Sequence, residues 1–545
     1  MLEIAQNPVS RPSMRPMSHR SSVLYSLPAL LLSAACLLPF LNKAFTIDDP
    51  LFLLQAQQIR KHPLHPQSLE VCWVEDNECG TVARIMPGNI LAPYYLLPVV
   101  NRSNPELFAH LLQIVTLWGG IVATVSLALA SGFTPFAACA AGLVLAATPP
   151  LLAMASTAMP DVLAMSLGVI GIERFLAWKR SCKAMDGVLS AFALALAPLA
   201  RVHLVFLWFV AALLLRDDAQ IFDLKSWLAI PAPRWRPLMA AAVLFVAALV
   251  LTHEPGSGIK PAHMFLRWGS AGHNLLSYFT DWVVAMPLGV AWIVLRNRRL
   301  HFWLLAIGLA LPLSWKLLIS HGSLQWSTLC AGLGAFVIMD IILWSVQSHD
   351  VTRLACVLWL ALPLAALPYI HLPVKFLVPC APAAALIVAD VLRPFPWRIT
   401  ALLGILAAGT VFGLLVLRAD YQFAEMGRQA AHRLLAPRVA AGHRVWFASQ
   451  WGFNWYAVKE GCQVLKSQDV PSPGDFFARG DMEGWPETLK RLPPALLVES
   501  YAVVGPGGRT MSEKDGAGLY TNNFGDLMWV WGTGEWNRYD LWQFK

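Results

Sequence analysis

Two adjacent carboxylates, Asp48 and Asp49, are the first residues in this chain whose types and spacing could do chemistry. They follow the first long apolar run and precede Pro50. A carboxylate within hydrogen-bond reach of a hydroxyl can take its proton and act as a general base. The alternative role is structural, because aspartate caps helices and proline is favoured in a first helical turn. A doublet also allows one carboxylate to cap while the other stays free for chemistry.

Three further polar residues lie at the ends of apolar runs: Asp161, which follows Met159-Pro160, and Arg201 with His203. Charges near a membrane core are costly and often functional. Asp161 has a structural alternative, since a carboxylate at a helix N-terminus interacts favourably with the helix dipole. Arg201 also has one, because long basic side chains near an interface extend toward water.

A basic segment late in the chain, His371-Leu-Pro-Val-Lys375-Phe-Leu-Val-Pro379, falls in a predicted outer loop. Lysine and arginine are normally concentrated in the cytoplasmic loops of membrane proteins. Lys375 runs against that trend, and an anionic phosphate group would supply a reason for it. Weaker candidates for contact with a substrate are His253, Glu254, Lys260, His263, Arg267, Lys316 and His321.

The composition indicates that membrane helices must position these groups. The chain has 545 residues, of which 57% are hydrophobic and only 14% are charged, and its mean hydropathy is +0.54. A soluble domain is about 45–50% apolar and about 25% charged, so a soluble globular enzyme is excluded. The net charge of +8 comes from short clusters of lysine and arginine between apolar runs, a pattern typical of cytoplasmic loops and not of a surface that binds nucleic acid.

Apolar runs that are candidate membrane spans occur near residues 23–42, 107–130, 135–152, 161–178, 187–200, 202–215, 238–252, 281–295, 301–319, 324–346, 354–370, 376–391 and 399–417. The two runs on either side of Arg201 are each shorter than the ~20 residues of a typical spanning helix. They predict two short helices, one bent span or a re-entrant element.

The positive charges predict an orientation with the N-terminus inside. The inner segments then carry Lys179, Arg180, Lys183, Arg216, Lys225, Arg234, Arg236, Arg296, Arg298, Arg299, Arg353, Arg393 and Arg398. This distribution satisfies the positive-inside rule. It places residues 43–106, residues 253–280 and everything after Arg418 outside, so all the candidate polar groups share the outer face.

The predicted fold class is an all-α polytopic membrane domain followed by a small α/β domain. Residues 1–22 are expected to be a cytoplasmic segment, 23–418 the membrane domain with a large first outer loop at 43–106, and 419–545 an extracytoplasmic domain. Arg444-Val-Trp-Phe-Ala448 and Ala495-Leu-Leu-Val-Glu499 have the composition of strands, and Gly/Pro turns lie between them.

The first outer loop carries two local signals. Apolar residues at Leu51, Leu54 and Ile59 among glutamines predict an amphipathic helix in the membrane interface. Cys72 and Cys79 share a short polar segment, and an oxidising compartment permits a disulfide between them. The alternative is two free thiols.

These features, in this order, resemble the GT-C superfamily of membrane glycosyltransferases, in particular the bacterial branch related to protein O-mannosyltransferases and lipid A aminoarabinose transferases. Asp48 and Asp49 match the acidic pair of the family's first outer loop, and Asp161 matches an aspartate after a proline-containing turn. Arg201 stands where the family often has a lysine. The segment Lys375-Phe-Leu-Val-Pro379 keeps the lysine and the proline of the family's late Lys-x-x-Arg-Tyr-x-x-Pro motif but lacks its Arg-Tyr.

The resemblance implies a GT-C-like fold with about 11–13 transmembrane helices in a bacterial inner or plasma membrane. It implies transfer of a sugar from a polyprenyl-phosphate-linked donor to a glycan, lipid or protein acceptor. Asp48 or Asp49 would be the general base, and Lys375 and Arg201 would bind the donor phosphate. Asp161, His371 and His203 would line the cavity. A divalent cation stays open, with Asp48 and Asp49 as its ligands if one is bound.

Three other functions are weighed against this one. A transporter or lipid flippase usually has inverted repeats or paired broken spans, and we find no convincing repeat in the sequence. An O-antigen ligase or polymerase would have its main outer loop late in the chain. A non-catalytic scaffold would not need acidic and basic residues converging on one face of the membrane.

Overall fold

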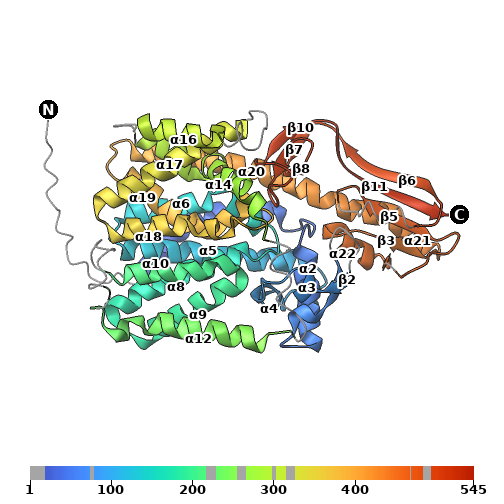
Figure 1. The fold of residues 1–545 in the computed structure, drawn as a ribbon, viewed down its shortest axis with the longest axis horizontal. Coiled ribbons are helices and arrows are strands. Elements are labelled where there is room, and N and C mark those ends of the chain that lie inside the picture. Colours follow the sequence, from blue (N-terminus) through green and yellow to red (C-terminus); the bar gives the residue numbers. More distant parts are fainter. Residues whose placement is uncertain are drawn as a thin grey trace.

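The computed structural model describes residues 19–73, 79–216, 227, 229–254, 266–296, 302–314, 326–466, 468–482 and 492–545. A bundle of helices occupies one end of the molecule, and a region rich in strands occupies the other (Figure 1). The weaker candidates Lys260, His263, Lys316 and His321 lie outside the described residues, as do the first eighteen residues of the predicted cytoplasmic segment.

The helices follow one another in the order α1 His19–Leu37, α2 Asp49–Lys61, α3 Val82–Ile85, α4 Leu91–Tyr95, α5 Pro105–Ala130, α6 Pro135–Ala146, α7 Pro149–Ala155, α8 Asp161–Ser181, α9 Ala184–Ala200, α10 Leu207–Leu214, α12 Arg236–Leu251, α14 Ala271–Val284, α15 Pro287–Leu295, α16 Phe302–Ser314, α17 Trp326–Ser348, α18 Val351–Leu360, α19 Ala381–Leu392, α20 Arg398–Ala430, α21 Ala436–Ala440 and α22 Trp451–Lys459. Helix α2 confirms the amphipathic helix predicted after Pro50.

The helices of the bundle include membrane spans. Within the described residues, six helical segments are long and apolar enough to cross a membrane, and two bent pairs raise the number to eight. Shorter apolar helices lie at Ala184–Ala200, Val202–Leu214 and Val351–Ala366. The chain is therefore an integral membrane protein with an all-α membrane domain.

Prolines divide two of the predicted spans. Helices α6 and α7 meet at 61° before Pro149, and the helix ending at Val284 meets α15 at 63° before Pro287. The residue before a proline is disfavoured in helical geometry, so the helix ends there and restarts at a new angle. The two runs beside Arg201 form α9 and α10, joined by the 3₁₀ turn Val202–Phe206. Of the three alternatives for this region, the structure has two short helices.

The C-terminal region contains a five-stranded sheet in the order β4-β3-β5-β11-β6. Its strands are β3 Val445–Phe447, β4 Gln463–Val464, β5 Phe476–Gly480, β6 Ala495–Val504 and β11 Glu535–Phe544. Strand β3 runs parallel to β4 and β5, whereas β11 is antiparallel to β5 and β6. Both predicted strand segments are confirmed. Two small sheets pair β7 Gly507–Arg509 with β10 Val530–Gly532, and β8 Met511–Ser512 with β9 Ala517–Gly518.

The membrane domain and the C-terminal region share one helix. Helix α20 begins at Arg398 in the bundle and extends into the strand-rich end without a break at residue 419, where the sequence predicted a domain boundary (Figure 1). A π-helical turn at Ala431–Leu435 and the short helix α21 continue it to Ala440. The C-terminal region is therefore attached by a continuous helix and not by a linker.

The loop between helices α1 and α5 contains a disulfide. Strands β1 Glu70–Cys72 and β2 Cys79–Thr81 form an antiparallel pair in which Cys72 lies opposite Cys79. The two cysteines form a disulfide, which confirms the pairing that the sequence left open against free thiols. The bond holds the hairpin closed at the far end of helix α2.

Candidate functional site

The candidate site begins with the short segment between helices α1 and α2. Ile47, directly before the acidic pair, has a φ of 47°. A β-branched residue rarely adopts this conformation, which costs about 1–3 kcal/mol and persists only where surrounding contacts hold it. The strained turn lies where Asp48 and Asp49 enter α2, and the environments of the two carboxylates differ.

The Asp49 carboxylate is fully buried and accepts two backbone hydrogen bonds. The N–H of Thr46 donates to Oδ2 at 3.1 Å, and the N–H of Ala158 donates to Oδ1 at 2.8 Å. Asp49 thereby ties the first outer loop to the turn before helix α8. Burial raises the pKa of Asp49 to about 7, although Lys43 and the two N–H donors favour the charged form. Asp49 is therefore structural but does not cap α2, because the N–H groups of Thr46 and Ala158 that it binds lie outside that helix.

The Asp48 carboxylate is in a different situation. Asp48 is the half-buried N-cap residue of α2, and its side chain makes no capping hydrogen bond. Of the charged side chains near Lys375, Asp48 has the largest electrostatic effect on it, ahead of Arg201 and Asp161. The doublet thus supplies one carboxylate to the backbone and leaves the other without a capping bond, close enough to Lys375 to act on its charge.

The Lys375 ammonium is a buried cation. Lys375 lies in the 3₁₀ helix Val374–Cys380, is only 4% exposed, and has its Nζ 5.7 Å from the centre of the Tyr520 ring. Within the described part of the chain, no carboxylate lies within 4.0 Å of this nitrogen. A buried charge without a bonded counterion is costly. The position therefore has the chemistry of a binding site for an anion.

Arg201 and Asp161 meet in a bidentate ion pair. Nε of Arg201 donates to Oδ1 of Asp161 at 3.0 Å, and Nη2 donates to Oδ2 at 2.6 Å. Such a pair fixes the plane of the guanidinium group. The guanidinium carbon lies 5.5 Å from the centre of the Phe376 ring. Arg201 is thus held beside the residue that follows Lys375 in sequence.

The two histidines of the site pack around the same ring. His203 stacks on Phe376 with ring centres 5.5 Å apart, and His371 meets it edge-on at 6.4 Å. Nδ1 of His371 lies 3.1 Å from Oγ1 of Thr521, which comes from the C-terminal region. Burial, with the positive charges of Lys375 and Arg201, lowers the pKa of His371 to about 3. His371 is therefore neutral at physiological pH and does not add a second cation.

The structure brings together most of the residues that the sequence singled out. Arg201, Asp161, His203 and His371 surround the Lys375–Phe376 pair, and Asp48 acts on Lys375 from α2. Asp49 also acts on Lys375, but more weakly, and its oxygens are occupied by backbone donors. The weaker candidate Glu254 instead lies 3.5 Å from His65.

A buried ion pair beneath this cluster was missed by the sequence analysis. Lys43 and Asp420 form a direct contact, and both side chains are fully buried. Tyr520 donates its hydroxyl to Oδ2 of Asp420 at 2.7 Å. A signal existed, since Lys43 directly follows the first apolar run and Asp420 comes three residues after the last, at positions where charges are costly. Nothing in the sequence marks Tyr520, a tyrosine in a polar tail.

A loop of the C-terminal region reaches into the membrane domain beside the site. The Asn522 amide accepts from the N–H of Leu372 at 2.9 Å and donates to Asn274 and Ser277 of helix α14 at 3.0 and 2.9 Å. Asp526 accepts from Ser277 at 2.9 Å. A buried polar network whose donors and acceptors are hydrogen-bonded is rigid. These bonds therefore hold the loop in one position.

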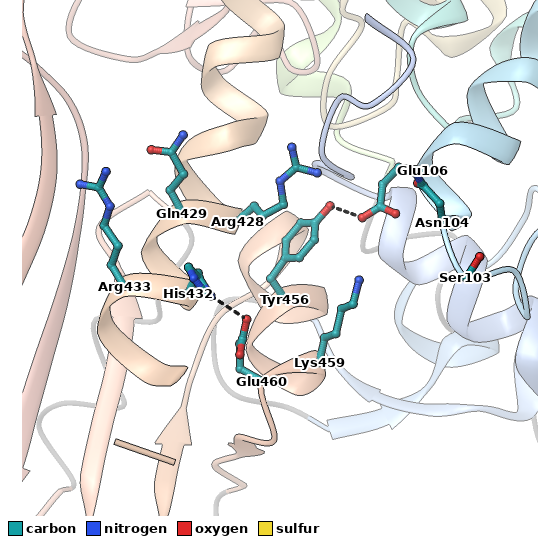
Figure 2. Close-up of a pocket in the computed structure, with 10 residues that line it drawn as sticks. All are labelled: Ser103, Asn104, Glu106, Arg428, Gln429, His432, Arg433, Tyr456, Lys459 and Glu460. Carbon is teal, nitrogen blue, oxygen red and sulfur yellow. Dashed lines mark hydrogen bonds and ion pairs between the residues drawn. The ribbon is translucent and has the colours of Figure 1, made fainter. Parts of the chain in front are cut away.

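A separate outer cavity of about 620 Å³ lies between α20, α22 and the start of α5 (Figure 2). It is lined by Ser103, Asn104, Glu106, Arg428, Gln429, His432, Arg433, Tyr456, Lys459 and Glu460. Tyr456 donates to Glu106 at 2.9 Å, as Figure 2 shows, and accepts from the N–H of Phe45 at 2.9 Å. The cavity therefore adjoins the segment that carries the acidic pair.

Comparison with known proteins gives structural matches only. No family model matches the sequence, and no curated protein matches it. The oligosaccharyltransferase of Archaeoglobus fulgidus, tethered with an acceptor peptide, is 14% identical with a TM-score of 0.49; the match covers 83% of this chain and 64% of that one. ArnT from Cupriavidus metallidurans, bound to undecaprenyl phosphate, is 12% identical with a TM-score of 0.43 over 89% of this chain and 97% of that one.

The mycobacterial arabinofuranosyltransferase AftD is 14% identical with a TM-score of 0.37 over 97% of this chain and 40% of that one. This chain spans 64% of the length of the archaeal enzyme. Likenesses at these scores and identities carry no statement about activity.

The donor set for a metal ion is sparse. Both oxygens of Asp49 accept backbone hydrogen bonds, which leaves Asp48 as the member of the doublet with a free carboxylate. Among the described residues, no group of three or more His, Cys, Asp or Glu side chains is placed to hold a metal ion. The described residues therefore offer no preformed set of ligands for a divalent cation.

The buried Asp49 predicts a pH dependence of stability. Its pKa is about 7 in the folded protein against an ordinary value of 3.8, so its favourable contribution is complete below pH 3.8 and is lost as the pH rises through about 7. Asp49→Asn removes this titration. The unaltered protein should therefore lose stability relative to Asp49→Asn between about pH 4 and 7, measured as the thermal midpoint of the full chain in detergent.

The exposed carboxylate of Glu70, in the same loop, provides the control. Glu70→Gln should leave the pH profile of the midpoint unchanged. Parallel profiles for Asp49→Asn and the unaltered protein would show that Asp49 does not titrate in this range.

Proposed function

We propose that the chain is a membrane glycosyltransferase that transfers a sugar from a polyprenyl-phosphate-linked donor to an acceptor on the extracytoplasmic side. The observation that carries the proposal is the buried Lys375 ammonium, which has no bonded carboxylate among the described residues and lies within electrostatic reach of the Asp48 carboxylate. A cation and a base on one outer face are the two groups that displacement of a lipid phosphate requires.

The proposed reaction is a displacement at the anomeric carbon of the donor sugar. The acceptor hydroxyl forms the new carbon–oxygen bond, the bond to the phosphate oxygen breaks, and the hydroxyl proton passes to Asp48. Negative charge grows on the departing phosphate as this bond breaks. A fixed cation such as Lys375 stabilises that charge more in the transition state than in the ground state, which accelerates the step.

The neighbouring residues support these two roles by position and charge. The Asp161 carboxylate pairs with Arg201 and fixes its guanidinium beside Phe376. The Arg201 side chain therefore keeps one orientation in the site. Neutral His371 and His203 fill the space around the same ring. A lipid phosphate entering at Lys375 would meet a cationic site whose geometry is already set, and pre-organisation of this kind lowers the cost of binding.

The proposed orientation follows from the charge distribution of the loops. The N-terminus is cytoplasmic, and the C-terminal α/β region lies on the extracytoplasmic side with the candidate site. The acceptor would be a glycan, a lipid or a protein that approaches from this side. The outer cavity of Figure 2 adjoins Phe45, which lies three residues before Asp48, and provides one such approach.

Asp48→Asn tests the general base. The amide keeps the size of the side chain but cannot accept the proton, so turnover should fall by about a hundredfold or more, the usual scale for loss of general-base help. Transfer to acceptor is measured with purified full-length protein and a polyprenyl-phosphate sugar. Glu70→Gln makes the same chemical change at an exposed position of the same loop and should keep full activity. Normal turnover by Asp48→Asn would remove Asp48 from the mechanism.

Lys375→Met tests the phosphate site. Methionine keeps an unbranched side chain without the buried charge, so the ligand-free protein should become more stable while its activity falls. A hydrogen bond to a charged group contributes about 1.5–3 kcal/mol, so kcat/KM for the donor should drop roughly ten- to a hundredfold.

The exposed Lys466, which lines neither the site nor the cavity of Figure 2, allows a matched control. Lys466→Met should change neither the stability of the ligand-free protein nor the kcat/KM for the donor. If Lys375→Met raises the thermal midpoint but leaves kcat/KM unchanged, Lys375 does not bind the donor.

A further inference from the structure

Four arginines gather at the end of the helical bundle opposite the C-terminal region. Arg296 follows α15, Arg353 lies in the first turn of α18, Arg393 follows α19, and Arg398 begins α20. In Figure 1, helices α18 and α19 lie in the part of the bundle that is far from the strands. None of these residues takes part in the candidate site, so the cluster needs its own explanation.

The arginines line a cavity of about 700 Å³. The same cavity is lined by apolar side chains of Leu295, Trp344, Val391, Pro394 and Phe395. A second cavity of about 390 Å³ shares Trp344, Arg353, Asp390 and Arg393 with it. The hollow therefore combines cationic groups with an apolar wall.

Aromatic rings hold the guanidinium groups in place. The Arg353 guanidinium lies 4.0 Å from the centre of the Trp344 ring, and the Arg296 guanidinium lies 5.4 Å from the same point. Arg398 lies 4.7 Å from the Phe136 ring. Cation–π contacts of this kind orient arginine without neutralising its charge.

Carboxylates neutralise only part of the cluster. Asp340 pairs with Arg296 at 3.1 Å, and Asp390 pairs with Arg353 at 2.8 Å and with Arg393 at 3.2 Å. Four arginines thus meet two aspartates, which leaves an excess of positive charge. Asp350 lines the smaller cavity, where it caps α18 through the N–H of Thr352. Arg398, among the residues that the structure describes, has no carboxylate partner.

The depth of the cluster in the membrane follows from helix α20. Arg398 and Asp420 lie on this continuous helix, and at 1.5 Å per residue they are about 33 Å apart along its axis. A bilayer's hydrocarbon core is about 30 Å thick. The two lengths match, so a helix α20 that crosses the bilayer with Asp420 near one leaflet carries the arginines to the headgroup layer of the other.

We propose that this cavity binds the phosphodiester headgroup of an anionic phospholipid. Arginine is well suited to phosphate because its planar fork donates two parallel hydrogen bonds. Basic pockets between transmembrane helices on the cytoplasmic side bind anionic headgroups, and the lysine and arginine clusters predict that this end is cytoplasmic. The apolar wall beside the arginines favours a lipid over free phosphate, because it gives the glycerol and acyl chains a surface to cover.

The test measures lipid binding to the full-length protein in detergent by native mass spectrometry. Dioleoylphosphatidylglycerol should remain bound where dioleoylphosphatidylcholine does not. Each arginine near a headgroup contributes about 1 kcal/mol, so Arg398→Gln should weaken phosphatidylglycerol binding about fivefold, and Arg393→Gln with Arg398→Gln about 25-fold. Lys183→Gln removes one exposed positive charge from the same end of the bundle, outside both cavities, and should have no such effect.

Three results would overturn the proposal. The first is equal retention of the two lipids. The second is equal weakening by Arg398→Gln and Lys183→Gln, which would indicate a general charge effect. The third is displacement of phosphatidylglycerol by millimolar inorganic phosphate, which would indicate a site for the free anion. The lipid measurement needs no sugar donor or acceptor, so it stands or falls independently of the proposed transferase activity.

Discussion

The buried ion pair between Lys43 and Asp420 organises the end of the membrane domain that carries the candidate site. It joins the segment after helix α1 to the middle of helix α20, and Tyr520 adds a hydrogen bond from the C-terminal region. A buried pair is a weak source of net stability, because desolvation offsets most of the attraction. Removing one partner, however, would leave an isolated buried charge. The pair therefore fixes the relative position of three distant chain segments.

The division of labour within the acidic pair follows from this arrangement. Lys43 anchors the start of a short segment, the strained Ile47 turns it, and Asp49 binds the backbone of Ala158 at its end. With both ends held, Asp48 has no structural hydrogen bond to make. Its carboxylate is left free to act on Lys375, a buried residue with no bonded carboxylate among the described residues.

The sequence predicted what local signals encode. Strands at Val445–Phe447 and Ala495–Val504, helix α2 and the Cys72–Cys79 disulfide all follow from periodicity, turns or short spacing. The outer-face cluster was expected from sidedness, which is a property of the loops alone. The pairing of Lys43 with Asp420 was not, because its partners are 377 residues apart and each charge has many possible partners. The separate roles of Asp48 and Asp49 depend on backbone donors that sequence cannot place.

The central claim is that Lys375 and Asp48 share one site for a lipid phosphate. A cryo-EM structure of the full-length protein with a bound polyprenyl phosphate tests it most directly. The account predicts a phosphate oxygen about 2.7–2.9 Å from Nζ of Lys375, the length of a charge-assisted hydrogen bond, with the Asp48 carboxylate open to the same cavity. A phosphate held instead by Arg428 and Lys459 in the outer cavity, with Lys375 still without an anion, would contradict it.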